Sequence, residues 1–396
     1  MPGVTPETLA RLRTPDGLNA LAEAADATAA SAGDPLAAAS SLRSRGIDPE
    51  LAAAALTQVE LRRRAETKFG AAARDMFFTR AGLEQATRAV VAERRAARLA
   101  AAGVRTLADL GCGLGSDALA AARAGIRVYA VEADPLTSEI AAANVVALGL
   151  DALVKVECAD ATTVRVEDYD AVFADPARRR AGRGRVFDPK SYSPPWDFVA
   201  GLADRVPRTV LKLAPGIDHE LLPPGAEGEW VSVDGDLVEA AFWCGPLAEV
   251  PRRATLLPAG AELTGTGRER APVGEVGAFL YDPDPAVVRS HLVAEFAASI
   301  GGRLADPDIA YVYTDGAVFT PYGRRLEVLD VLPFSLKRLR ALMRERGIGR
   351  LEIRKRGSAL EPDQLRRDLR LSGPAAASLV LTRIGGAPMA LLCRAS

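Results

Sequence analysis

The sequence predicts an α/β protein, in which a doubly wound parallel sheet lies between a helical N-terminal segment and a small α+β C-terminal domain. Three observations predict this. Helix-forming residues dominate the first 100 positions, short apolar segments alternate with helical ones from residue 104 to about residue 260, and a second strand–helix pattern fills the last 76 residues. The expected boundaries are 1–100 (helical region), 101–260 (α/β domain), 261–320 (connecting region) and 321–396 (terminal domain).

The composition of the chain excludes several classes of protein. With 396 residues, 48% hydrophobic and 26% charged, the chain can bury two or three cores. No apolar run approaches a membrane span of about 18 residues, and the first residues lack a signal-peptide pattern, so we expect a cytoplasmic protein. The four cysteines form no CxxC pair and the two histidines lie far apart, so we expect no metal site.

The N-terminal region carries clear helix boundaries. Asp48-Pro49-Glu50 is typical of a helix start, and the helix should run from Leu51 to Lys68 and stop before Gly70. Thr79 is expected to cap a further helix that continues to Ala102. The segment Ser31–Ser41, rich in small residues, is the predicted linker.

Strands and helices then alternate. Five strands are predicted at Thr106–Leu110, Arg127–Glu132, Val154–Cys158, Ala171–Ala174 and Thr209–Leu213, and two more, Leu237–Cys244 and Ala254–Leu257, are expected to form a closing hairpin. Pro285–Ile300 should be helical. The tail is predicted as strand Leu326–Leu332, helix Ser335–Arg346, strand Leu351–Arg356, helix Pro362–Leu369 and strands Ser378–Arg383 and Pro388–Cys393.

A glycine-rich loop follows the first predicted strand and opens a helix. It reads Asp109-Leu110-Gly111-Cys112-Gly113-Leu114-Gly115. Glycines let a backbone turn tightly beside a ligand, and a helix N-terminus offers unpaired N–H groups. A dinucleotide loop would place its third glycine at position 116, which is Ser116, and an acid before the first glycine would repel a pyrophosphate. The loop therefore favours a ligand whose ammonium group Asp109 would bind.

This loop resembles motif I of the class I S-adenosylmethionine-dependent methyltransferases, which have a Rossmann-like sheet. Glu132, 21 residues after Gly111, ends the second strand, where a carboxylate can accept both ribose hydroxyls. Asp160 ends the third, where that superfamily places its adenine contact. The resemblance implies S-adenosylmethionine as cofactor, with these contacts: Asp109, Gly111, Gly113, Gly115, Asp117, Glu132, Ala133, Asp160, Ala161 and Asp175.

The predicted catalytic residues are Asp175, Pro176 and Arg178, after the fourth strand. Enzymes that methylate exocyclic base amines carry Asp/Asn/Ser-Pro-Pro-aromatic there; the polar groups accept the amine protons, and the aromatic ring stacks on the base. Asp175 and Pro176 keep the polar part, whereas Ala177 and Arg178 replace the second proline and the aromatic residue. Arg178 would stack on a base or contact a phosphate. Ser193-Pro194-Pro195-Trp196 comes 18 residues later and is expected to begin a helix.

Aromatic and basic residues are candidates for substrate contact. Phe77 and Phe78 lie between two predicted helices; one of them is expected to cover the cofactor or stack on the substrate, with Thr79 or Arg80 as a polar contact. Five arginines crowd residues 178–185, including Arg179 and Arg183. Residues 321–396 hold 16 basic and 7 acidic residues, a net charge of +9 in a chain of net −1. We expect the strand end Arg354-Lys355-Arg356 to contact RNA phosphates, and to form one basic face with Arg366, Arg367 and Arg370 on or just after the next helix if the two surfaces adjoin.

The chain as a whole resembles bacterial class I methyltransferases with a C-terminal THUMP-like domain. The segments that carry the resemblance are Lys68–Gly70, Met76–Thr87, Asp175–Arg179, Val331–Lys337 and Leu351–Gly357. The resemblance implies S-adenosylmethionine binding and an RNA substrate. We therefore expect an enzyme that methylates a base nitrogen of structured RNA, tRNA or rRNA. A small-molecule or protein methyltransferase, or a non-catalytic RNA-binding protein that retains the cofactor, stays open as an alternative.

Overall fold

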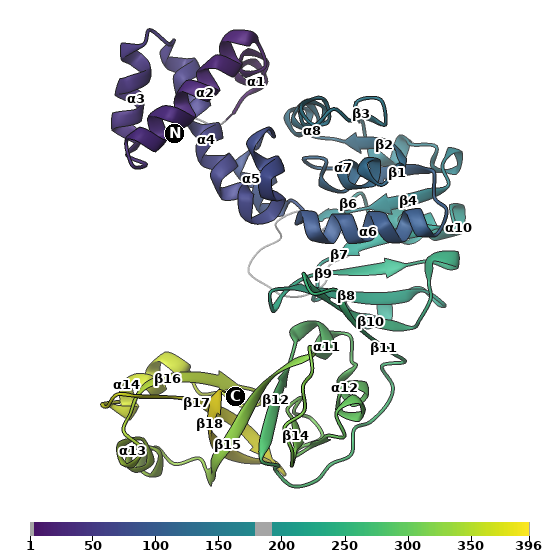
Figure 1. Cartoon of the computed structure of the whole chain (residues 1–396). Coiled ribbons are helices and arrows are strands. Elements are labelled where there is room, and N and C mark those ends of the chain that lie inside the picture. Colours follow the sequence, from purple (N-terminus) through teal and green to yellow (C-terminus); the bar gives the residue numbers. More distant parts are fainter. Residues whose placement is uncertain (1–3, 179–191, 396) are drawn as a thin grey trace. The chain divides into compact units, whose positions relative to one another are not determined.

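The computed structural model describes residues 4–178 and 192–395. The chain forms two compact units (Figure 1). The first comprises residues up to Leu213 with Asp218–Ala226 and Phe242–Ala248, and the second comprises Ala214–Ile217, Glu227–Ala241 and the chain from Glu249 onward. Within the described ranges, no helix combines the length and the apolar character needed to cross a membrane.

Six helices open the first unit: α1 (Pro6–Leu12), α2 (Pro15–Ala30), α3 (Pro35–Ser44), α4 (Pro49–Phe69), α5 (Arg80–Gln85) and α6 (Ala89–Ala101). The predicted helix start at Asp48 and stop at Gly70 are confirmed. The predicted linker is wrong in its second half, because Asp34 accepts backbone N–H groups and Pro35 starts α3. The helix predicted from Thr79 to Ala102 is two helices, α5 and α6.

A parallel sheet forms the centre of the first unit. Its strand order is β7-β4-β1-β2-β3. The bounds are β1 (Thr106–Leu110), β2 (Arg127–Glu132), β3 (Val154–Cys158), β4 (Ala171–Ala174) and β7 (Thr209–Leu213), which confirms the five predicted strands. Because the strands are parallel, their carboxyl ends lie at one edge, where open α/β sheets bind ligands.

Helices connect these strands. The connections contain α7 (Ser116–Arg123), α8 (Pro135–Ala147), α9 (Trp196–Ala200) and α10 (Leu202–Arg205). After β4, the two-residue strands β5 (Ala177–Arg178) and β6 (Tyr192–Ser193) pair antiparallel. The expectation that the Ser193–Trp196 segment begins a helix is confirmed, since α9 starts at Trp196.

The second unit begins with strands that the sequence only partly revealed. They are β8 (Glu227–Val233), the Asp236–Ala241 part of β9 (Asp236–Trp243), β10 (Arg252–Leu257) and β11 (Ala261–Gly265). The predicted hairpin between the β9 and β10 segments is wrong, because β10 pairs in parallel with β8. The strand β8 was not predicted because its glutamates give the segment a polar character. Glu227 and Glu229 are buried, and they accept hydrogen bonds from Arg253 and Thr255 of β10.

A seven-stranded sheet completes the second unit, in the order β13-β14-β12-β15-β18-β17-β16. Its elements are β12 (Phe279–Pro283), α11 (Pro285–Arg289), α12 (Val293–Ser299), β13 (Arg303–Leu304), β14 (Val312–Thr314), β15 (Gly323–Pro333), α13 (Leu336–Glu345), β16 (Ile348–Lys355), α14 (Pro362–Leu369), β17 (Ala375–Ile384) and β18 (Ala387–Ala395). All six predicted tail elements are present. The predicted boundary at residue 321 nevertheless cuts this sheet, which includes β12–β14. The helix predicted over 285–300 is divided at His291, whose φ is +63°.

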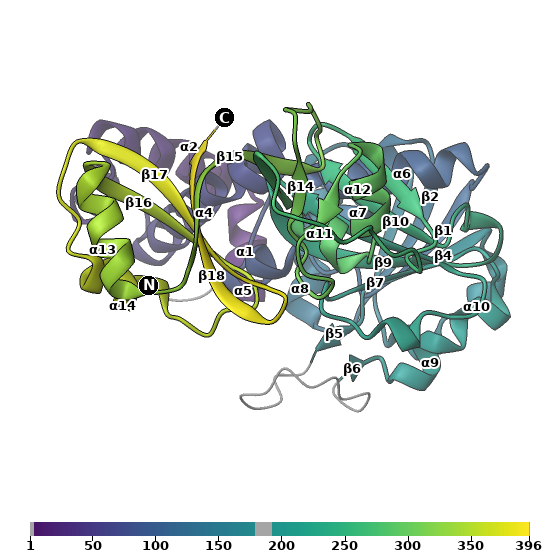
Figure 2. The ribbon, with the colours of Figure 1, turned by 90° about the horizontal axis from the view of Figure 1, so that it is seen from below.

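Helices α13 and α14 cover one end of this sheet (Figure 2). Leu339 and Met343 of α13 and Leu365 and Leu369 of α14 share a buried core with strand residues such as Leu379. The apolar face of each helix is therefore used inside the unit, and the polar face points to solvent.

Candidate cofactor and catalytic site

The glycine-rich loop has a backbone that only glycine adopts readily. Gly111, Gly113 and Gly115 have φ values of +89°, +55° and +89°, and Gly115 is the N-cap of α7. A Cβ at Gly111 would lie 3.1 Å from the carbonyl oxygen of Asp175. The loop therefore turns sharply against the end of β4, and the predicted loop geometry is present.

Asp109, at the end of β1, is the most unusual group beside the loop. Its side chain is fully buried, and neither carboxylate oxygen has a hydrogen-bond partner among the described residues. Burial, together with the charges of Asp117 and Asp175, raises the pKa of Asp109 well above its usual range, although Lys212 and Arg95 oppose that shift. A buried carboxylate without a partner is costly, so this position fits a site completed by a cationic ligand.

A continuous set of hydrogen bonds joins four elements beside Asp109. The Lys212 ammonium, at the end of β7, donates to Asp175 Oδ2 at 2.5 Å and to Thr87 Oγ1 at 2.9 Å. The Thr87 hydroxyl donates to Asp117 Oδ2 at 2.7 Å, and Arg95 Nε donates to Asp117 Oδ1 at 2.9 Å. We call these five residues, Asp175, Lys212, Thr87, Asp117 and Arg95, the strand-end network.

The charges of Asp109 and this network do not balance. Asp109, Asp117 and Asp175 are three acids, whereas Arg95 and Lys212 are two bases. Burial would raise the pKa of Asp117, but Arg95, Lys212 and the Thr87 hydrogen bond outweigh it and lower that pKa, so Asp117 is an anion. With all three acids ionised, the group carries one negative charge in excess, which one ligand cation would neutralise.

Comparison with known proteins identifies the family. Residues 108–176 match the family model described as Methyltransferase domain, residues 323–395 match THUMP domain-like, and residues 5–65 match a domain of unknown function. An uncharacterized S-adenosylmethionine-dependent methyltransferase of Mycobacterium tuberculosis, found in two strains, is 37% identical over 353 residues, which cover 85% of this chain and 95% of the relative. This chain belongs to the S-adenosylmethionine-dependent methyltransferases.

A solved structure agrees with that family. A protein from Porphyromonas gingivalis proposed to be a methyltransferase shares the fold with a TM-score of 0.70, over 88% of this chain and 92% of its own, at 22% identity. The predicted Rossmann-like methyltransferase fold with a THUMP-like C-terminal domain is therefore confirmed, and the cofactor is S-adenosylmethionine. That cofactor carries an ammonium group, which fits the buried Asp109 carboxyl group that has no hydrogen-bond partner among the described residues.

The other predicted cofactor residues lie along the same strand ends. Glu132 Oε2 accepts the N–H of Gly113 at 3.1 Å and Oε1 accepts that of Asp134 at 3.0 Å, so the carboxylate is held beside the loop. Asp160 accepts the backbone N–H of Thr162 at 2.8 Å and caps a short 3₁₀ turn, Ala161–Thr163; this hydrogen bond lowers the pKa of Asp160. Ala133 directly follows β2, and Ala161 is buried. Their contacts with the cofactor stay predictions.

The structure does not support the stacking role predicted for Phe77 and Phe78, and their role in covering the cofactor stays a prediction. Their side chains are 3% and 0% exposed, so neither ring offers a face to a substrate, and Phe78 packs on Phe69 with ring centroids 5.5 Å apart. Gln58 of α4 holds the Phe78 backbone through hydrogen bonds at 2.8 and 3.0 Å. Thr79 accepts the N–H of Gly82 and is the N-cap of α5.

The cations predicted for the tail are engaged within the second unit. Arg354 and Arg356 both pair with Asp282 of β12, and Lys355 pairs with Glu361 at 3.0 Å. These acids compete with phosphates for the three cations, and the predicted contact of this strand end with RNA phosphates stays a prediction.

The arginine-rich segment lies largely beyond what can be described. Arg178 belongs to β5, and Pro176, just before it, is buried. Arg179 and Arg183 lie outside the described residues. Their predicted substrate contacts stay predictions.

Thr87, Arg95 and Lys212 were missed from the sequence. Only Lys212 offered a signal, as a lysine inside the apolar strand Thr209–Leu213, at the edge where ligands bind. Thr87 lies in the break between α5 and α6, which the sequence did not reveal. Lys68 supports that break, because its ammonium donates to the carbonyl oxygens of Leu83, Glu84 and Ala86 at 2.7, 2.9 and 3.0 Å.

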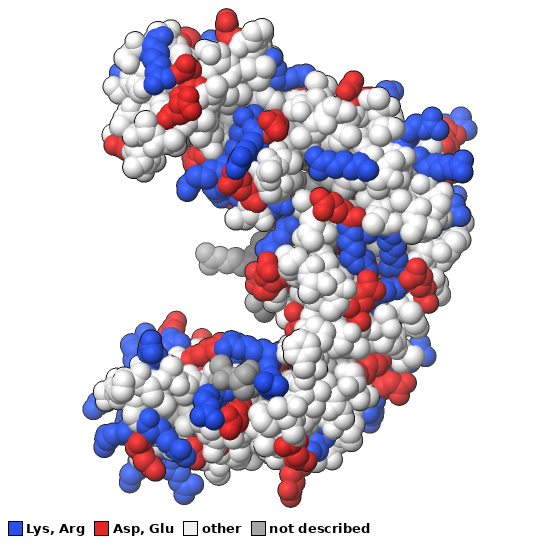
Figure 3. Space-filling view, in the orientation of Figure 1, with Lys and Arg blue, Asp and Glu red and all other residues white. Residues whose placement is uncertain are grey.

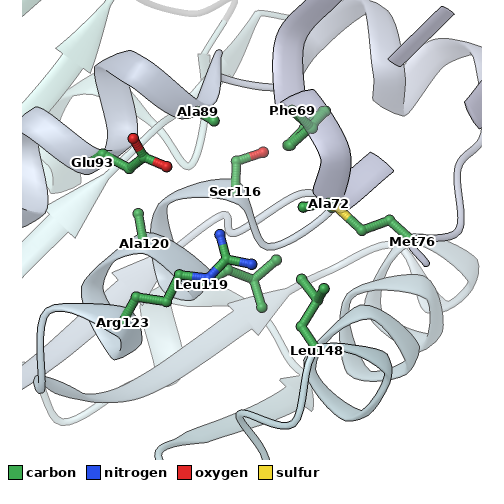
Figure 4. A pocket seen from close by; sticks show the side chains of 10 residues that line it. All are labelled: Phe69, Ala72, Met76, Ala89, Glu93, Ser116, Leu119, Ala120, Arg123 and Leu148. Atoms are coloured by element: carbon green, nitrogen blue, oxygen red, sulfur yellow. The ribbon is translucent and has the colours of Figure 1, made fainter. Parts of the chain in front are cut away.

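A separate cleft of about 310 Å³ lies beside the first turn of α7 (Figure 4). Phe69, Met76, Leu119 and Leu148 give it an apolar lining. Its lining contains none of the predicted cofactor or catalytic residues, so the cleft is distinct from the site at the strand ends.

Proposed function

We propose that this methyltransferase modifies structured RNA, tRNA or rRNA, at a base nitrogen held beside Asp175. The observation that carries the proposal is a cationic surface on α13 and α14, inside the region that matches the THUMP domain-like family. We infer a nitrogen acceptor from the Asp175-Pro176 pair after β4. This pair corresponds to the first two residues of the Asp/Asn/Ser-Pro-Pro-aromatic motif, whose oxygen atoms accept the protons of the target amine.

On the cofactor side, Asp109 would bind the ammonium group of S-adenosylmethionine and Glu132 the ribose hydroxyls. Two features support this assignment. Asp109 is buried without a partner, and Glu132 is fixed by two backbone N–H groups beside the loop. When bound, the cofactor supplies an electrophilic methyl group on its sulfonium.

The acceptor group would be held by Asp175. Its side chain is 34% exposed, and Oδ2 is occupied by Lys212 at 2.5 Å. A target amine would therefore donate to the Asp175 carboxylate and to the carbonyl oxygen of Pro176, which points the nitrogen lone pair away from these acceptors. Transfer to a neutral amine depends mainly on such positioning and on electrostatics.

The cationic surface keeps Arg366 and Arg367 of the predicted basic face and adds residues of α13. Lys337, Arg338 and Arg344 of α13 are exposed, and the described residues give none of them an acidic partner. Arg366 and Arg367 of α14 are also exposed, and Arg366 pairs with Asp363 at 2.8 Å. Figure 3 shows many lysines and arginines over these two helices. A face with exposed cations suits a phosphate backbone, because each contact releases counterions from the RNA.

Nucleoside analysis tests the proposal. RNA from a strain that lacks the gene should lose one methylated base, and the purified enzyme should restore it with S-adenosylmethionine. A mass-spectrometric profile that does not change on deletion would count against an RNA substrate. Methyl label that enters protein or small molecules instead would favour the alternative enzyme, and RNA binding without any transfer would favour the non-catalytic alternative.

A further inference from the structure

The Asp175 carboxylate is held by one lysine, and the two groups come from adjacent strands. Asp175 follows β4, and Lys212 lies near the end of β7, which pairs with β4 in parallel. The Lys212 side chain is 12% exposed, far less than that of Asp175 at 34%. The lysine is therefore the more buried partner, and the carboxylate keeps part of its surface exposed.

The same ammonium reaches the N-terminal region. Thr87 Oγ1 accepts from Lys212 at 2.9 Å and donates to Asp117 at 2.7 Å. Thr87 is buried in the break between α5 and α6, and Lys68 fixes the end of α5 by donating to its carbonyl oxygens. Burial and the charges of Arg88 and Lys212 lower the pKa of Lys68 to about 8.

The Lys212 ammonium therefore connects Asp175 with Thr87. We propose that Lys212 is a positioning residue for methyl transfer, which fixes the Asp175 carboxylate and ties it through Thr87 to the N-terminal helical region. The inference rests on the proposed role of Asp175 in holding the acceptor. It also gives the N-terminal region a part in catalysis, since that region supplies the second anchor of the lysine.

Kinetics provide the first test. Lys212→Met should lower kcat by roughly ten- to a hundred-fold, the effect of removing one charge-assisted hydrogen bond. The Kd of S-adenosylmethionine should rise by less, because Lys212 also favours the ionised form of Asp109. Lys212→Arg should recover part of the rate. Thr87→Val should lower kcat less, and Thr87→Ser should retain it. Lys155→Met is the matched control, because Lys155 is an exposed lysine paired only with Glu157 among acids. A Lys212→Met enzyme with the wild-type kcat would overturn the proposal.

A second experiment tests the RNA proposal and the role of Lys212 independently, by identifying which fraction of an extract accepts the methyl group. Label from methyl-tritiated S-adenosylmethionine would be followed into the RNA, protein and small-molecule fractions of an extract from a strain lacking the gene. If wild-type enzyme labels only protein or small molecules, the RNA proposal fails. The lysine variants are then compared on that fraction, where the same reduction of kcat is expected.

Nitrogen NMR offers a readout that needs no acceptor. The chain has only six lysines, so the ¹⁵Nζ signals of lysine-labelled protein can be assigned with single Lys→Arg variants. The Lys212 signal should be protected from exchange and should shift in Asp175→Asn and in Thr87→Val, while the Lys155 signal stays in place. A Lys212 signal that neither variant moves would overturn the proposal, even if Lys212→Met does not fold.

Discussion

The side-chain amide of Asn144, on α8, closes a two-way hydrogen bond with the backbone of Phe77. Asn144 Oδ1 accepts the Phe77 N–H at 2.6 Å, and Nδ2 donates to the Phe77 carbonyl at 3.2 Å and to the Leu114 carbonyl at 3.1 Å. Leu114 lies in the glycine-rich loop, so one buried amide joins the N-terminal region to the cofactor loop. The segment before α5 is therefore fixed to the glycine-rich loop.

Removing that amide should affect both stability and cofactor binding. Asn144→Ala leaves three buried backbone groups without partners, and each such group costs about 1–3 kcal/mol, so the free energy of unfolding should fall by at least about 2 kcal/mol. The Kd of S-adenosylmethionine should rise as the loop loosens. Denaturant unfolding and calorimetry would measure these effects. Asn19→Ala, on the exposed face of α2, is the control, expected within about 0.5 kcal/mol of wild type. Equal stability of the two variants would contradict this role.

Asp109 should make cofactor binding depend on pH. Because its folded pKa is raised from 3.8, the unliganded protein holds this proton more tightly than the unfolded chain does. The resulting stabilisation is full below pH 3.8 and disappears as pH rises through the folded pKa. A ligand ammonium favours the ionised carboxylate, so affinity should increase with pH over that window, and binding should release a proton.

Calorimetry in buffers of different ionisation enthalpy would detect this proton. The binding enthalpies in the different buffers should be compared below about pH 7, where the ligand's α-amino group stays protonated. Asp109→Asn should bind about ten- to a hundred-fold more weakly, with an enthalpy that no longer depends on the buffer. A variant that releases the same number of protons as wild type would assign the titration to another group.

Glu132 should act on the ribose as well as on the loop. Glu132→Gln keeps one acceptor oxygen and should raise the Kd of S-adenosylhomocysteine by roughly ten-fold, since a charge-assisted hydrogen bond is weakened. The same variant should affect an analogue that lacks both ribose hydroxyls less, through the lost hydrogen bond to the Gly113 or Asp134 N–H alone. Glu139→Gln, an exposed residue of α8, serves as the control. Equal reductions in affinity for both ligands would mean that Glu132 only supports the loop, through Gly113 and Asp134.

Sequence patterns were informative where one local feature decides a structure. Short apolar runs defined all five parallel strands, and the glycine spacing defined the loop. The patterns failed where contacts with residues distant in the sequence determine the local structure. β8 has buried glutamates that only Arg253 and Thr255 explain, and the break at Thr87 depends on partners at positions 117 and 212. Phe77 and Phe78 gave no sign that Asn144 and Gln58 would hold their backbone. The strand-end network could not be predicted because it joins four segments far apart in the chain.

Two groups of cations in the second unit should behave differently. Arg354 and Arg356 neutralise Asp282, whose side chain is only 13% exposed, and Arg356 also lies 5.4 Å from the ring centre of Tyr311. Replacing both arginines by Met should reduce the free energy of unfolding by about 1–3 kcal/mol, because a largely buried carboxylate would then have no cationic partner. The salt dependence of RNA binding should change little. A variant with wild-type stability would mean that these pairs contribute nothing to the fold.

The cations of α13 should show the opposite behaviour. Replacing Lys337, Arg338 and Arg344 by Ala preserves helix propensity and removes three unpaired charges, so stability should be nearly unchanged. RNA affinity should fall, and the slope of log K against log salt should decrease by up to about 0.7–0.9 for each phosphate that is no longer neutralised. The matched control replaces Arg13, Arg43 and Arg63, three exposed arginines of the N-terminal helices that also lack acidic partners among the described residues. It removes the same net charge, so any general electrostatic effect appears in both variants. If the slope decreases equally in the two triple variants, binding follows net charge alone. A decrease confined to the α13 variant would identify this helix as the surface that meets the RNA backbone.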